Sequence, residues 1–398
     1  MTNRWCVLAL LFGVRCAMGY QFQTAAALSP TIMQTYGVDI ASLGLLIGLY
    51  LSPGIFLALP GGGIGKRFGD KRAVSAGLVL MVLGGAIMAF STSWEGQIVG
   101  RSVAGIGGVL LNVLMSKMVA DWFVGREIAT AMGVFVNSWP VGIALALVAA
   151  PIVAELGGLP AAHGVAAGLA GLALLGLATL YRQPAIAETA ATPQASPGPG
   201  LRGVVLAAVA TSGVIWGVYN AALAMVFSFG PAMLAARGWS EAAASSATSV
   251  ALWLLAVSVP LGGFIADRLG RPRLTMVACW LLFAASLPLA ARSSAVVPMF
   301  AIIGLVGGAA AGPIMSLPSR VLAAENRAVG MGIFFSIYYL AIFLAPIVAG
   351  WAADRVGSPA VAFDLGAAML VACCGALWLF ERQAFVVARA APLRAGAA

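Results

Sequence analysis

The chain has 398 residues, of which 62% are hydrophobic and only 9% are charged. Soluble domains are about 45–50% apolar and about 25% charged, so this composition excludes a soluble enzyme, a disordered chain and a secreted disulfide scaffold. The formal net charge of +9 comes from short basic clusters between long apolar runs. That pattern indicates a lipid bilayer and excludes nucleic acid as the partner.

The apolar runs predict an all-α membrane protein with twelve transmembrane helices, because each crossing needs about 20 mostly apolar residues. Unbroken runs such as 203–226 and 328–353 do not fit the short alternating strands of a membrane β-barrel. In chain order, the predicted helices cover residues 5–33, 41–62, 73–91, 97–119, 128–154, 162–181, 203–234, 242–265, 274–291, 297–322, 328–352 and 360–380.

The longest polar stretch lies between the sixth and seventh predicted helices. It is rich in Pro, Ala, Thr and Ser, a composition typical of a flexible linker. The expected domains are an N-terminal six-helix bundle over residues 1–181, a cytoplasmic linker over 182–202, a C-terminal six-helix bundle over 203–381 and a cytoplasmic tail over 382–398.

The two halves of the sequence repeat one another about 200 residues apart, which is typical of transporters built from internal repeats. Each match is short, but all of them fall in the same order along the chain. The repeated pairs are Pro30 and Pro231, Gly37 and Gly238, residues 60–69 and 261–270, and residues 150–154 and 345–349.

The basic residues predict the topology. Most of the 22 Lys and Arg residues lie in alternate loops or chain ends that would share one face of the membrane. Because positive loops stay in the cytoplasm, we expect both termini to be cytoplasmic and the two bundles to run parallel through the plasma membrane, here a bacterial inner membrane. The exceptions are Arg15 and Arg101 inside predicted helices, and Arg237, Arg292 and Arg355 on the other face.

Two motifs carry a family resemblance. The segment Gly262–Arg273 resembles the cytoplasmic loop signature of the major facilitator superfamily, and Gly62–Arg72 is its first-half copy, with Lys66 where an acid is usual. The segment Arg101–Gly108 resembles the fourth-helix pattern of the same superfamily. The resemblance covers nearly the whole chain. It implies two six-helix bundles that rock around a central site.

A second likeness concerns the substrate. The segment Arg15–Gln23 resembles the cyanate-permease-like branch of the superfamily. A basic residue in the first helix together with one in the fourth, Arg101, is similar to the organic-anion carriers.

The loop motifs are also candidates for gating. Their basic side chains could bond the carbonyls at a neighbouring helix C-terminus and hold one bundle closed on one side. The alternative is a topological anchor that any membrane protein needs. The candidate gating residues are Lys66, Arg67, Asp267 and Arg268.

Arg15 is the first candidate for substrate binding. A charged side chain at the bilayer centre costs about 2.5–3.5 kcal/mol on insertion scales, and each of the 13 acids falls in a loop or near a predicted helix end. A guanidinium that faces a wet cavity would bind an anion, whereas the alternative is an arginine bonded to backbone carbonyls. Arg101 shares a helix face with Asn112, and both ligand contact and a structural or gating role stay open for it.

Other polar and aromatic residues in helices that should face the centre complete the predicted site. Amides and phenols orient a small polar ligand, and aromatic rings bound its size. For each residue alone, helix packing is the alternative. These substrate-binding candidates are Gln23, Asn112, Asn137, Trp216, Tyr219, Asn220 and Tyr338.

The leading hypothesis is a monomeric secondary active transporter that moves a small anion by alternating access, with a coupling proton or a counter-substrate as a further partner. The alternatives are a multidrug or neutral-solute exporter of the same fold and, in a different class, a non-transporting membrane sensor. A single histidine and peripheral acids predict no enzyme, no metal site and no cofactor. The nucleotide loop GxxxxGK[ST] of an ATP-driven pump is absent from the sequence.

Overall fold

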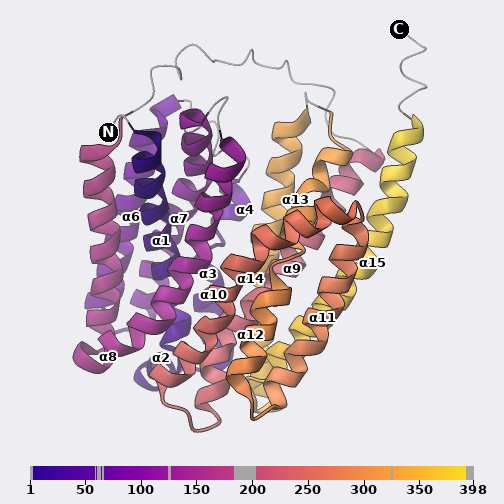
Figure 1. Ribbon diagram of the computed structural model, residues 1–398. Helices are drawn as coiled ribbons and strands as arrows, with labels where there is room; N and C mark the ends of the chain where they lie inside the picture. The colour runs from indigo at the N-terminus through magenta and orange to yellow at the C-terminus, as the bar shows by residue number, and fades with distance from the viewer. Residues whose placement is uncertain are drawn as a thin grey trace.

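The computed structural model describes residues 3–58, 60, 64, 67–123, 127–182, 203–323 and 326–390. Every regular element in these ranges is a helix, and the helices form two bundles that stand side by side (Figure 1). The start of α1 and the end of α15 lie at the same end of the molecule, which we call the terminal face. The other end, where α2 lies, is called the opposite face.

In the first bundle, two predicted helices are broken. The prediction for 5–33 is split at Leu28, where α2 begins with Pro30 in its first turn. The prediction for 41–62 is split at Pro53, since proline removes a backbone N–H and clashes with the preceding turn. The helices of this bundle are α1 (Arg4–Ala27), α2 (Ser29–Tyr36), α3 (Ile40–Leu49), α4 (Gly54–Leu57), α6 (Asp70–Phe90), α7 (Trp94–Trp122) and α8 (Ile128–Leu180).

The long helix α8 crosses the membrane twice. It has 53 residues, and a straight helix of that length would extend about 80 Å, more than twice the roughly 30 Å bilayer core. Gly157 and Gly158 leave the helical conformation, with φ of −147° and 71°, and the chain turns back there (Figure 1). The described chain has 11 segments long and apolar enough to span, so the two passes of α8 account for the twelve predicted crossings.

The second bundle follows the prediction with one further break, because the helix predicted over 297–322 is split into α12, α13 and the 3-10 turn η2. Its helices are α9 (Gly203–Ala235), α10 (Glu241–Leu269), α11 (Pro272–Arg292), α12 (Val296–Gly307), α13 (Ala311–Ser316), η2 (Pro318–Arg320), α14 (Arg327–Val356) and α15 (Val361–Ala390).

The last helix is longer than expected. Residues 382–390 continue α15 and do not form a separate tail. Two arginines stabilise this extension by stacking on aromatic rings one turn earlier: Arg382 lies 3.7 Å from the centroid of Trp378, and Arg389 lies 4.5 Å from that of Phe385.

The sequence repeat is also visible in the backbone. Gly37, just after α2, and Gly238, just after α9, both have positive φ, of 64° and 85°. Gly69 and Gly270 also have positive φ, of 84° and 59°, at the loop motifs. Because side-chain-bearing residues rarely adopt this conformation, the repeated glycines mark equivalent turns.

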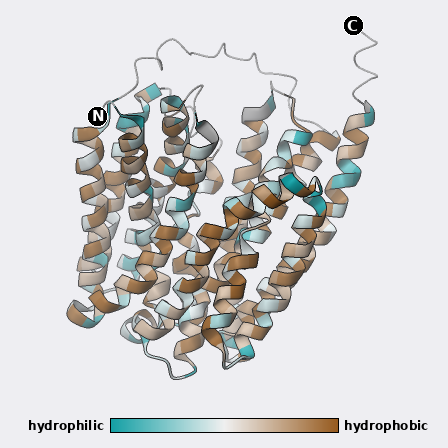
Figure 2. Ribbon diagram, in the orientation of Figure 1, coloured by the Kyte–Doolittle hydropathy of each residue, from teal (hydrophilic) through white to brown (hydrophobic). Residues whose placement is uncertain are grey.

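The bundles meet where α3 packs on α14, α8 on α10 and α1 on α9. Glycines bring the backbones of α3 and α14 into contact. A Cβ atom on Gly44 would overlap the carbonyl oxygen of Pro346, and one on Gly48 would overlap that of Phe343. Hydrophobic residues cover the outer helices along much of their length, as expected of a lipid-facing surface (Figure 2).

Candidate functional site

A cavity of about 160 Å³ lies between the two bundles. Residues of α1, α7 and α8 from the first bundle and of α9, α10 and α14 from the second line most of its wall. Seven of the nine predicted substrate-binding residues lie together there: Arg15, Asn112, Asn137, Trp216, Tyr219, Asn220 and Tyr338. Gln23 and Arg101 do not line the cavity.

Close packing of α1 against α8 positions Arg15. A Cβ atom on Gly19 would lie 2.9 Å from the carbonyl oxygen of Trp139, and one on Gly142 would overlap that of Cys16. With no side chain at either glycine, the two helices approach closely within a turn of Arg15.

The Arg15 guanidinium is held by neutral groups. Its Nε donates to Oδ1 of Asn112 at 3.0 Å, its Nη1 donates to the carbonyl of Phe135 at 3.3 Å, and its Cζ lies 4.8 Å from the centroid of the Phe135 ring. Within the described part of the chain, no carboxylate forms an ion pair with Arg15. The positive charge in the cavity is therefore not neutralised by a described side chain.

Asn112 connects Arg15 to the other bundle. While its Oδ1 accepts from Arg15, its Nδ2 donates to the Tyr339 hydroxyl at 3.2 Å. The Tyr339 ring in turn lies against Gly54, where a Cβ atom would overlap it. The guanidinium, the amide and the phenol thus form one chain of hydrogen bonds from α1 through α7 to α14.

Arg101 has a different environment. Its side chain is 1% exposed and donates to the carbonyls of Leu46 at 2.9 Å, Gln21 at 3.0 Å and Phe22 at 2.7 Å. Leu46 belongs to the last turn of α3, whose carbonyls have no partner within the helix. The Arg101 side chain therefore lies within the packing of α1, α3 and α7.

Three other candidates are engaged with the backbone. Gln23 donates to the carbonyl of Phe227 at 2.6 Å and so joins α1 to α9. The Tyr219 hydroxyl donates to the carbonyl of Gly307. The Asn220 Nδ2 donates to the carbonyl of Trp216 at 2.8 Å. Tyr219 can therefore offer the cavity its ring but not its hydroxyl proton.

Aromatic rings form much of the cavity wall. On the first-bundle side, Phe22 and Trp139 lie 5.1 Å apart between ring centroids. On the second-bundle side, Trp216 and Tyr338 lie 6.1 Å apart, and Tyr338 lies 4.9 Å from Tyr339. The sequence does not single out Phe22, because an apolar aromatic residue inside a membrane helix gives no signal that separates cavity wall from packing.

Two of the predicted gating residues, Arg67 and Arg268, can be located, and they lie in the loop motifs at the terminal face. Lys66 and the Asp267 side chain lie outside the described residues. Arg67 and Arg268 are exposed and stack on Phe68 and Phe264, with Cζ 5.4 and 5.1 Å from the ring centroids.

A neighbouring lysine makes the contact that was expected of the loop. Lys71 Nζ donates to the carbonyls of Ala178 and Tyr181, both at 2.8 Å, at the C-terminal end of α8. This bond joins α6 to α8 within the first bundle, so it holds that bundle together and does not join it to the second.

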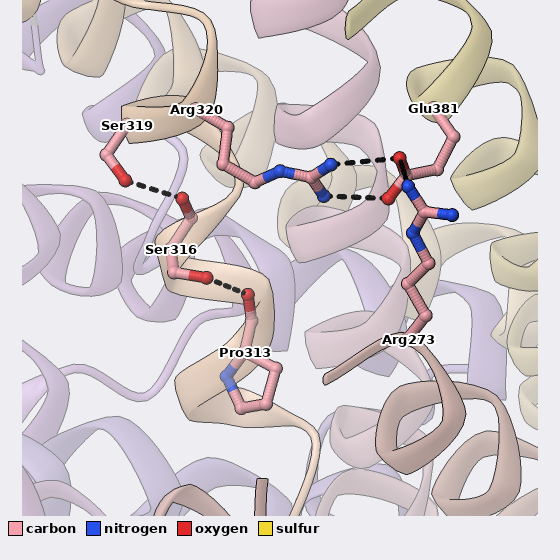
Figure 3. Close-up of polar contacts among 6 residues, drawn as sticks. All are labelled: Arg273, Pro313, Ser316, Ser319, Arg320 and Glu381. Atoms are coloured by element: carbon pink, nitrogen blue, oxygen red, sulfur yellow. Dashed lines mark hydrogen bonds and ion pairs between the residues drawn. The ribbon is translucent and has the colours of Figure 1, made fainter. Parts of the chain in front are cut away.

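Ion pairs at the terminal face also stay within one bundle. Glu381 accepts two hydrogen bonds from Arg320, at 2.7 and 2.9 Å, and also pairs with Arg273 (Figure 3). In the first bundle, Lys117 pairs with Asp70 and with Asp121. All of these pairs but Lys117–Asp121, which lies within α7, join neighbouring helices of one bundle, and no described charge bridges the two bundles on this side.

At the opposite face, polar contacts cross between the bundles. The Asp354 carboxylate of α14 accepts from the backbone N–H groups of Ile40 at 3.1 Å and Ala41 at 2.8 Å, the first residues of α3. Asp39 caps the same helix end, and hydrogen bonds from Ser42 lower the pKa of its carboxyl group, with the side-chain bond as the largest cause.

A second crossing contact lies beside the first. Glu241 of α10 accepts from the hydroxyl of Thr31 in α2, and Ser245 donates to the carbonyl of Ala27 at 3.0 Å. The two bundles are therefore fastened together at the opposite face.

Two six-helix bundles around a central cavity are the architecture of a multi-pass membrane transporter. The chain belongs to the Major Facilitator Superfamily, whose family model matches residues 10–234 and 215–395. This family assignment confirms the resemblance drawn from the loop motifs.

Curated relatives match a part of the chain. The 4-hydroxybenzoate transporter PcaK of Acinetobacter baylyi is 26% identical over 151 residues, which are 34% of this chain and 33% of PcaK. The inner membrane transport protein YajR of Escherichia coli is 31% identical over 151 residues, 36% of this chain and 33% of YajR. The alignments thus span about a third of the length of these relatives.

Solved structures match over nearly the whole chain. The inward-open xylose transporter XylE of E. coli has a TM-score of 0.78 at 14% identity, covering 95% of this chain and 96% of XylE. A bacterial homologue of the human lysosomal transporter Spinster, in an inward-facing and occupied conformation, has a TM-score of 0.72 at 15% identity, covering 98% and 97%. At these identities the likeness shows the fold alone.

Proposed function

We propose that the protein is a secondary active transporter that carries a small anion across the membrane by alternating access. The observation that carries the proposal is the Arg15 guanidinium, which lines the central cavity and is bonded only to neutral described groups. A charge in a low-dielectric cavity is stabilised by a counter-charge. A bound anion supplies that counter-charge during transport.

The contacts between the bundles support a rocking motion. Asp354 and Glu241 fasten the bundles at the opposite face, whereas the ion pairs at the terminal face stay within each bundle. If the topology predicted from the basic residues holds, the cavity faces the cytoplasm in this conformation. Opening to the other side requires these crossing contacts to break.

The loop residues Arg67 and Arg268 are then candidates for closing the terminal face. Both are exposed and both belong to the repeated loop motif, one in each bundle. When the bundles approach on this side, the two loops can exchange their present ring contacts for carbonyls at the facing helix ends. Lys66 and Asp267 would belong to the same gate.

The relatives add support from a different direction. PcaK is named for 4-hydroxybenzoate, an organic anion, and matches about a third of this chain. The name of this relative therefore agrees with the anionic substrate that we propose from Arg15.

The test is uptake by proteoliposomes that contain the purified full-length protein. A panel of radiolabelled organic and inorganic anions, neutral solutes and organic cations is offered, and initial rates are compared with protein-free vesicles. We expect uptake of anions. We also expect Arg15→Met to abolish it while inserting normally, because the methionine keeps the length of the side chain and removes the charge.

Arg355→Met is the matched control, since Arg355 is exposed at the opposite face and stacks on Trp351. Its uptake should equal that of the wild type. Anion uptake that survives in Arg15→Met, or uptake confined to neutral solutes or cations, would overturn the proposal.

A further inference from the structure

We infer that the anion is a monocarboxylate whose organic body is flat and apolar. The inference rests on the proposed function and deepens it, because the same cavity and the same arginine are involved. Three features of the cavity carry it: its charge, the free donors of its guanidinium, and the chemistry of its walls.

The first feature is the charge of the cavity. Among the described residues that line it, Arg15 alone carries a formal charge, and no Lys, His, Asp or Glu lies beside it. One anionic group brings the cavity to neutrality. A dianion would leave a second negative charge in a low-dielectric space without a partner, which is strongly unfavourable.

The second feature is the set of donors that Arg15 has left. A guanidinium has five N–H groups in one plane. One on Nε and one on Nη1 bond Asn112 and Phe135, and no described residue accepts from Nη2. The remaining donors lie at the Nη1 and Nη2 end, where the two coplanar oxygens of a carboxylate match them in a bidentate pair.

The orientation of this donor set is fixed on its other sides. Asn112 holds Nε, and the Phe135 ring covers a face of the guanidinium with its centroid 4.8 Å from Cζ. A side chain held in this way loses little freedom when a carboxylate binds, which favours the pair further.

The third feature is the wall. Phe22 and Trp139 on one side, and Trp216 and Tyr338 on the other, present rings to the same cavity as Arg15. Aromatic faces favour stacked or edge-on contact with a flat apolar body. A halide, nitrate or acetate ion would occupy the guanidinium and leave these walls without contact. The cavity therefore fits a carboxylate attached to a ring or a planar chain.

The experiment is equilibrium binding of radiolabelled benzoate to the full-length protein in lipid nanodiscs, with unlabelled competitors. Benzoate has one carboxylate on a flat ring. Benzamide has the same shape without the charge, phthalate has a second carboxylate, and acetate lacks the ring. We expect each of the three competitors to be weaker than unlabelled benzoate by at least about tenfold, since hydrogen bonds to charged groups and stacked rings each contribute that much.

Two variants separate specific binding from partition into lipid. Arg15→Met should abolish the saturable benzoate signal. Arg15→Lys keeps the charge and loses the planar fork, so affinity for benzoate should fall by about tenfold or more, and affinity for acetate should fall with it. Arg355→Met should bind as the wild type does.

The outcomes distinguish the two levels of the argument. If acetate or phthalate competes as well as benzoate and Arg15→Met abolishes binding, the protein is an anion carrier and the proposed class of flat, apolar monocarboxylates is wrong. If benzamide competes equally and Arg15→Met binds normally, the anion function itself fails. Benzoate binding that depends on Arg15 and is displaced only weakly by all three competitors supports both the anion function and the monocarboxylate class.

Discussion

Replacing Arg101 should damage folding, whereas replacing Arg15 should damage binding. Both are arginines inside apolar helices, and the sequence does not separate them. Arg101 donates to the carbonyls of Leu46, Gln21 and Phe22 and is 1% exposed, while Arg15 lines the cavity. We therefore expect Arg101→Met to lower the free energy of unfolding by more than Arg15→Met does, because Arg15 makes only two such bonds, to Asn112 and Phe135.

The magnitude follows from the bonds that Arg101 loses. Polar contacts between helices in a membrane contribute about 0.6–1.7 kcal/mol each, because the unfolded chain in the bilayer also finds partners. Three such bonds at 2.7–3.0 Å give a loss of about 2–5 kcal/mol. The ring of Tyr50, 4.7 Å from the Arg101 Cζ, adds a cation–π contact of about 0.5–2 kcal/mol.

The assay is reversible unfolding by SDS titration in mixed micelles, followed by tryptophan fluorescence, beside benzoate binding in nanodiscs. Arg101→Lys keeps the charge but reaches fewer carbonyls, so its stability should lie between those of the wild type and Arg101→Met. An Arg101→Met protein that unfolds as the wild type does but no longer binds benzoate would refute the reasoning. It would place Arg101 in the binding site.

Two further predictions concern the contact between the bundles, and both are measured by spin-label distances across the opposite face in a background without native cysteines. Gly44→Ala forces a Cβ atom into the carbonyl oxygen of Pro346, so it should shift the equilibrium toward separated bundles by about 5- to 150-fold, whereas Gly13→Ala, with open space around it, should not. Asp354→Asn replaces charged acceptors at the α3 N-terminus with a neutral one and should shift the same equilibrium by about fivefold. Unchanged spin-label distances in Gly44→Ala or Asp354→Asn would contradict the role of α3 and α14 in holding the bundles together.

Most of the architecture is predictable from the sequence because membrane helices obey a single strong rule. Their backbone groups must be satisfied internally over about 20 apolar residues, so apolar length alone locates them. The repeat then predicts two equivalent bundles, and the positive φ of Gly37 and Gly238 agrees with it. Arg15 could be singled out because no acid lies in the apolar runs.

Only part of the cavity wall can be predicted from the sequence. Trp216 and Tyr338 could be proposed as site residues, but Phe22 and Phe227 could not, since a ring that faces the cavity and a ring that faces another helix leave the same hydrophobic signal. Which ring faces inward depends on the rotation of each helix. That rotation is set by packing details such as Gly19 against Trp139.

The sequence leaves two roles open for Arg101, ligand contact and helix packing, because it does not show where the second predicted helix breaks. The predicted helix over 41–62 is unbroken, and an unbroken helix has no free carbonyls in its interior. Pro53 follows the end of α3 at Leu49, and the carbonyl of Leu46 in the last turn of α3 then accepts from Arg101. Arg101 supplies a donor to this helix end. Its buried position therefore depends on the break that Pro53 makes in the predicted helix. Arg15 instead bonds the side chain of Asn112 and the carbonyl of Phe135 and lines the cavity, which is the basis for proposing an anion as its further partner.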